Sequence, residues 1–162
     1  MSDVAKSKEL LKRYSIARIP FIAVNTIERA RTLDILKEIA EELALPFYVH
    51  TLSKGLYDLT TEKVINDDKS VYGAIDFMSE QMKRKQYMTL ILTEVPDLSG
   101  DNSDSKQILD LVTLANESGG VVIVLTNHAI WNQLQRLGMV IKIDLPNEDE
   151  MYAIIKEYID DY

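Results

Sequence analysis

The chain has 162 residues, of which 46% are hydrophobic and 27% are charged, and it contains no cysteine. The lack of cysteine excludes disulfide scaffolds, thiol enzymes and cysteine-based zinc sites, and the apolar fraction is sufficient for one folded domain. With 18 basic and 26 acidic residues, the net charge of −8 argues against nucleic acid as a partner.

Five short apolar runs, rich in β-branched and aromatic residues, are predicted to be strands. They are residues 21–25, 46–51, 87–93, 120–126 and 139–144. The runs are nearly continuous and do not alternate with polar residues, so we expect helices on both faces of a parallel sheet. None approaches the 18 residues of a membrane span, and residues 1–6 lack the apolar stretch of a signal peptide. We therefore expect a cytoplasmic protein without a membrane partner.

Apolar residues with helical spacing separate these runs and predict helices. The predicted helices are residues 6–14, residues 27–43, one around 71–82, one around 108–115 that stops at Gly119 and Gly120, and a last one from Pro146. In the last helix Asn147 is a candidate N-cap, with Glu150 three residues on. Two polar segments, 52–69 and 96–103, are expected to be loops. The alternation of strand and helix predicts a single three-layer α/β domain.

The turn after the first strand excludes a standard phosphate-binding loop. Residues 26–31 read Thr-Ile-Glu-Arg-Ala-Arg without any glycine, and neither GxxxxGK[ST] nor GxGxxG occurs in the chain. Such loops need small residues, so that backbone N–H groups can close on the anion, and the first type also needs a lysine. This absence is the strongest functional signal in the sequence.

Polar residues follow the later strands, at the edge where open α/β sheets bind ligands. Glu94, with Asp97 just beyond it, could hold magnesium through water or orient a nucleophile, or be a solvated loop carboxylate. Asn127 and His128 could position a phosphate or a water molecule, or cap a turn. His50 is the other of the two histidines, so a histidine pair would need two different strands to converge, and we expect no metal site.

Three segments resemble, in order, the second half of a AAA+ ATPase module. Residues 91–94 (Ile-Leu-Thr-Glu), 122–127 (Val-Ile-Val-Leu-Thr-Asn) and 143–150 (Ile-Asp-Leu-Pro-Asn-Glu-Asp-Glu) are similar to its Walker B strand, its sensor 1 strand and its final strand with the following turn. Residues 19–31, 45–50 and 53–56 resemble the degenerate N-terminal domain of AAA+ proteins known from cyanobacteria, chloroplasts and other bacteria. In those proteins a domain without a P-loop precedes the active ATPase domain.

The resemblance implies a P-loop NTPase-like fold, with five parallel strands in the order 5-1-4-3-2 and helices on both faces. It implies that residues 1–162 are one degenerate AAA-like domain, the N-terminal part of a longer ATPase. It places Glu94 at the Walker B glutamate, Asn127 at sensor 1 and Arg136 near the region of the arginine finger, as vestigial site positions. The Walker A loop is replaced by residues 26–31, Thr93 replaces the Walker B aspartate, and the helical lid is missing after Tyr162.

These features predict a domain that is not an enzyme and that holds no cofactor. Its expected role is to assemble with copies of itself or with active AAA+ ATPase domains, or to recruit a client protein. The alternative is a nucleotide sensor or weak ATPase that uses Lys54, Arg29 and Asn127. A third possibility is an adaptor that binds a protein through residues 52–69. Basic residues gather in the first eighteen positions and acidic residues in the last fifteen, as two solvated helix faces or as a head-to-tail contact between copies.

Overall fold

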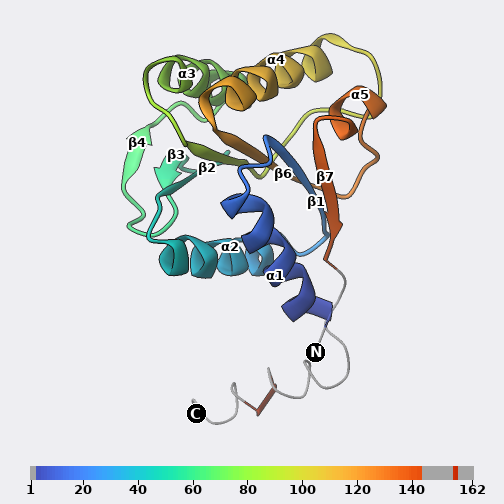
Figure 1. Cartoon of the computed structure of the whole chain (residues 1–162). Coiled ribbons are helices and arrows are strands. Elements are labelled where there is room, and N and C mark those ends of the chain that lie inside the picture. Colours follow the sequence, from blue (N-terminus) through green and yellow to red (C-terminus); the bar gives the residue numbers. More distant parts are fainter. Residues whose placement is uncertain (1–2, 144–154, 157–162) are drawn as a thin grey trace.

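The computed structural model describes residues 3–143 and 155–156. One sheet of seven strands runs through the molecule, in the order β4-β3-β2-β5-β6-β1-β7 (Figure 1). The strands are β1 (Phe21–Asn25), β2 (Phe47–Thr51), β3 (Gly55–Asp58), β4 (Val64–Asn66), β5 (Thr89–Leu92), β6 (Val121–Thr126) and β7 (Gly138–Lys142). Neighbouring strands pair in parallel across β2-β5-β6-β1-β7. β3 pairs antiparallel with both β2 and β4.

The expected α/β fold is confirmed, but the prediction of five strands that are all parallel is wrong. The five expected strands lie side by side as β7-β1-β6-β5-β2, and the hairpin of β3 and β4 extends the sheet beyond β2. This hairpin occupies the segment that the sequence predicted to be a loop. Leu56, Tyr57 and Leu59 of this segment are buried, because a strand too short to stand out in the sequence can still be covered by the rest of the fold.

Helices cover both faces of the sheet, which makes three layers (Figure 1). They are α1 (Asp3–Ile16), α2 (Arg29–Leu43), α3 (Val71–Arg84), α4 (Ser103–Ser118) and the short α5 (Asn132–Gln135), which the sequence did not predict. The predicted helix from Pro146, including Asn147 and Glu150, falls outside the described residues except for 155–156. In the part of the chain that the structure describes, no helix is long and apolar enough to cross a membrane.

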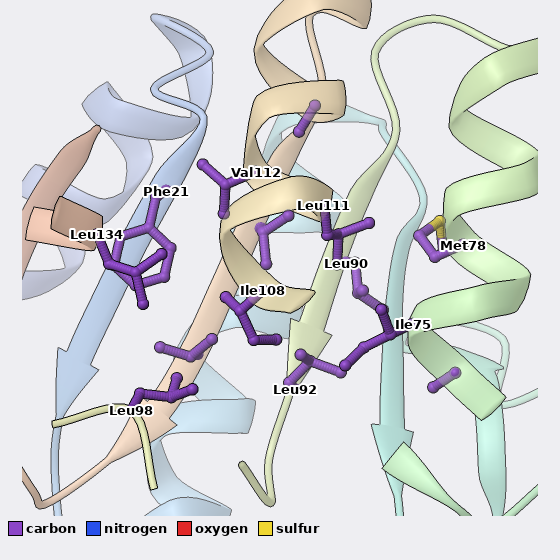
Figure 2. Close-up of a cluster of buried hydrophobic side chains, with 14 of the residues drawn as sticks. Phe21, Ile75, Met78, Leu90, Leu92, Leu98, Ile108, Leu111, Val112 and Leu134 are labelled. Carbon is purple, nitrogen blue, oxygen red and sulfur yellow. The ribbon is translucent and has the colours of Figure 1, made fainter. Parts of the chain in front are cut away.

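Each face of the sheet has its own hydrophobic core. In β6, Val122 and Val124 pack under α3 and α4, whereas Val121, Ile123 and Leu125 pack toward α1 and α2. Figure 2 shows the first of these cores, in which side chains of α3 and α4 meet those of the strands. A continuous apolar strand is therefore buried on both sides, as its composition predicted.

Residues suited to capping a helix lie at both ends of α4. The side chain of Asn102 accepts a hydrogen bond from the backbone N–H of Ser105, which caps the first turn. At the other end Gly119 adopts a left-handed conformation with φ of 70°, which confirms the predicted stop. The cap sets the start of α4 at Ser103, directly after the loop that follows β5.

Candidate functional site

The carboxyl ends of β1, β5 and β6 surround a cavity of about 340 Å³. The residues that line it are Thr26, Ile27, Arg29, Thr93, Glu94, Val95, Leu125, Thr126, Asn127 and His128. Parallel strands direct their carboxyl ends to one edge of the sheet, and ligands of open α/β domains bind there. The cavity is therefore the candidate functional site.

An ion pair crosses this site. Arg29, the first residue of α2, donates from its Nη1 to Oε1 of Glu94, which lies just beyond β5. The two residues are 65 positions apart in the chain, so only the folded sheet brings them together. Arg31 lies 3.7 Å from Glu28, whereas Arg29 pairs across the cavity.

The turn between β1 and α2 is closed by side chains. Oγ1 of Thr26 accepts the backbone N–H of Glu28 at 3.0 Å and lies 3.3 Å from the hydroxyl of the buried Thr32. Thr32 in turn donates to the carbonyl oxygen of Glu28. A turn held in this way is a tight Ser/Thr-type turn, and it differs from a glycine-rich loop whose backbone N–H groups surround a phosphate.

Thr93 has its hydroxyl engaged by a neighbouring strand. The side chain is 2% exposed, and Oγ1 donates to the carbonyl oxygen of His50 in β2 at 2.8 Å. A hydroxyl in this position helps to hold β2 against the end of β5. It supplies no carboxylate for a magnesium ion, which prefers charged oxygen ligands.

The loop after β6 adds polar groups to the rim of the cavity. The backbone N–H of His128 donates to Oγ1 of Thr126 at 3.1 Å, which orders the turn that carries Asn127. Across from it, Asp97 accepts hydrogen bonds from the hydroxyl and the backbone N–H of Ser99. These hydrogen bonds hold the pKa of Asp97 below its ordinary value, and the nearby His128 adds a smaller effect.

The structure brings two of the three predicted site positions together. Glu94 and Asn127 both line the cavity, whereas Arg136 lies at the end of α5 and is not among the lining residues. Lys54, expected near a nucleotide, lies over the ring of Tyr57 at 4.9 Å. Nε2 of the buried His50 lies 3.0 Å from the carbonyl oxygen of Asp68, so this histidine does not join His128.

Two features of the site were not anticipated from the sequence, namely the pairing of Arg29 with Glu94 and the position of His128 near Asp97. The first could have been suggested by charge, because an arginine and a glutamate each follow a predicted strand. The order of the strands decides which of the many charges meet. In the described part of the chain, no three histidine, aspartate or glutamate side chains gather as a metal site.

The ion pair is expected to contribute little to stability. The Arg29 and Glu94 side chains are 49% and 39% exposed, and exposed ion pairs contribute only about 0 to 1 kcal/mol. Glu94→Gln should therefore change the free energy of unfolding, measured by urea denaturation, by less than about 1 kcal/mol. Glu80→Gln, which breaks an exposed pair with Lys83 away from the cavity, is the matched control. A much larger loss for Glu94→Gln alone would mean that the pair holds the start of α2 against the end of β5.

The chain was compared with protein families, curated proteins and solved structures. The family model of the SpoVK-like AAA ATPase N-terminal domain matches residues 7–143. No curated protein and no solved structure matches the chain. The matched region runs from α1 to the end of β7, so it includes the whole sheet and every residue that lines the cavity.

Proposed function

The chain belongs to the family of SpoVK-like AAA ATPase N-terminal domains, and from this premise we propose that it is a non-catalytic module of a AAA+ ATPase. Its role is to contact other proteins, which are copies of itself, active AAA+ ATPase domains or a client protein. The proposal includes the P-loop-less type of domain, as in the cyanobacterial and chloroplast proteins, and a cytoplasmic location.

The observation that carries the proposal is the ion pair between Arg29 and Glu94. Phosphoryl transfer depends on a loop and a lysine that hold the phosphates, on carboxylates that hold magnesium, and on a group that orients the nucleophile. At the position of the phosphate loop this chain has a tight turn followed by Arg29, which pairs with the carboxylate best placed to orient water. Thr93, at the position of the metal aspartate, donates a hydrogen bond from its hydroxyl to the carbonyl oxygen of His50 in β2. Each of these contacts opposes catalysis.

A nucleotide sensor is the second candidate, and the cavity itself favours it. Arg29 and Asn127 both line the cavity, and a guanidinium and an amide can bind phosphate oxygens without a glycine loop. Binding would then require Arg29 to exchange Glu94 for the phosphate. The loss of one ion pair costs little free energy, so a direct binding measurement is needed to separate the two candidates.

We expect titration calorimetry with ATP and ADP, with and without magnesium, to give no saturable binding tighter than about 100 μM, which corresponds to about −5.5 kcal/mol. Phosphate release from ATP should equal that of buffer. Arg29→Ala and Arg136→Ala, inside and outside the cavity, should behave like the parent chain. Saturable binding that Arg29→Ala abolishes and Arg136→Ala preserves would establish the sensor and overturn the proposed function.

A further inference from the structure

A groove that faces solvent lies between α3 and α4. It has a volume of about 390 Å³, and both apolar and exposed acidic side chains line it. The apolar residues are the buried Ile75 and Leu111 and the partly buried Leu114, and the acidic residues are Asp76, Asp110 and Glu117. A groove between two helices, with an apolar base and charged sides, fits the face of an amphipathic helix.

The acidic side chains of this groove are not neutralised by ion pairs within the described residues. Asp76, Asp110 and Glu117 form no ion pair with any of those residues. Lys83 also lines the groove, but its Nζ contacts Oε1 of Glu80 on the same helix at 3.2 Å. A helix that complements the groove should therefore carry cationic side chains on both sides of an apolar one.

The outward face of α1 has this composition. Lys6 is exposed, Leu10 is 38% exposed and the Arg13 side chain is 71% exposed, and their spacing places them on one stripe of the helix. Arg13 lies 3.6 Å from Glu9 in an exposed pair that contributes little, and Lys6 has no ion pair among the described residues. Two other lysines of α1 are held by carboxylates of α2, so they do not belong to this stripe.

The stripe on α1 and one wall of the groove have the same spacing and opposite charges. Each has a charged residue, a leucine four positions later and a second charged residue three positions after the leucine. The two charges of each helix are thus about 10.5 Å apart along its axis and on nearly the same side. In an antiparallel alignment that matches the charges, the leucines are displaced by one residue. A parallel alignment of α1 with α4 matches every position and pairs Lys6 with Asp110, Leu10 with Leu114 and Arg13 with Glu117.

We propose that α1 of one copy docks in the groove between α3 and α4 of a second copy, parallel to α4. Because α1 and α2 cover one face of the sheet and α3 and α4 cover the other (Figure 1), a chain cannot fill its own groove. The contact joins two different surfaces, so it repeats from copy to copy and builds a ring or a filament. This inference rests on the proposed function and specifies the surfaces through which the module assembles.

The match of charge and spacing between two surfaces of one chain selects a second copy as the occupant of the groove. A helix of a client protein would fill the groove and leave the stripe on α1 uncovered. Self-association that depends on both surfaces is therefore the property that distinguishes the two occupants.

The test is sedimentation velocity of the full chain at increasing concentration, with Arg13→Glu and Glu117→Arg. The parent chain should self-associate with a dissociation constant below about 100 μM. Each variant alone should associate at least about tenfold more weakly, because like charges then meet at the contact. An equal mixture of the two variants should regain association, since the two substituted side chains attract each other and the unchanged Arg13 and Glu117 still do. Lys63→Glu, an equal change of charge at an exposed residue just before β4, should associate like the parent chain.

Three results would overturn the proposal. They are a parent chain that stays monomeric, association that only one or neither of the variants weakens, and a mixture that associates as weakly as each variant alone. If either variant unfolds, as judged by circular dichroism, Lys6→Glu and Asp110→Lys replace the pair, with the same expected results. The nucleotide titration on the same samples tests the proposed function separately, because a domain that binds no nucleotide can still be monomeric.

Discussion

A Gly138→Ala variant is expected to lose about 3 kcal/mol of unfolding free energy, at the upper end of the usual cost of adding an atom to a packed site. Gly138 begins β7 and lies beside Phe21 in the register with β1. A Cβ atom at Gly138 would overlap the carbonyl oxygen of Phe21, and it would also crowd the carbonyl carbon and Cβ of that residue. Phe21 is fully buried, so neither strand can shift without disturbing the core.

Urea denaturation followed by circular dichroism measures this loss, with the midpoint shifting and the slope unchanged. Gly100→Ala is the matched control, because nothing lies within 4 Å of a Cβ atom built there. The control should change the free energy of unfolding by less than about 1 kcal/mol. A similarly small effect for Gly138→Ala would show that β7 can move away from β1 without disturbing the core.

Removal of the Arg18 side chain is expected to cost about 2 to 3 kcal/mol, because one guanidinium joins three separate segments. Arg18 lies between α1 and β1, and its Nε donates to the carbonyl oxygen of Gly119 at 2.7 Å. Nη2 donates to the carbonyl oxygen of Met88 at 3.2 Å, and the group lies 5.9 Å from the ring centre of Tyr87. Partial burial lowers the pKa of Arg18 from its ordinary value.

Thermal or urea unfolding of Arg18→Ala, Arg18→Lys and Arg13→Ala separates charge from geometry. A lysine keeps the charge and loses the planar fork, so Arg18→Lys should recover only part of the loss. Arg13 is 71% exposed in a helical pair with Glu9, so Arg13→Ala should change stability by less than about 0.5 kcal/mol. If Arg18→Ala were as mild as Arg13→Ala, the three hydrogen-bonded segments would have to be held by other contacts.

Local patterns were sufficient for most of the elements. The apolar run of β6 predicted a strand buried on both faces, and Gly119 predicted the end of α4, because burial and left-handed backbone geometry each limit the residues that can occupy a position. The hairpin of β3 and β4 was missed because its strands are only four and three residues long and lie in a segment with many polar residues. Such strands are stabilised by their neighbours in the sheet, and that contribution has no local signal.

For the candidate site, strand-end reasoning selected Glu94 and Asn127, and both line the cavity. It could not decide whether Arg136 would join them, since that depends on how the chain passes from β6 through α5 to β7. The sequence also left the ion-pair partner of Arg29 undecided, because a long charged side chain near a strand end has several carboxylates within reach. Strand order reduces these choices to Glu94.

By itself the sequence determined the α/β class, the five strands of the parallel part of the sheet, the resemblance to AAA+ proteins and the absence of a phosphate loop. These features depend on residue type and spacing within short segments, where sterics and burial act locally. Only the tertiary structure decided that Arg29 pairs with Glu94, that Arg18 joins three segments, and that β4 and β7 are the outermost of the described strands. Those contacts join residues far apart in the chain, and the packing of the whole sheet selects them.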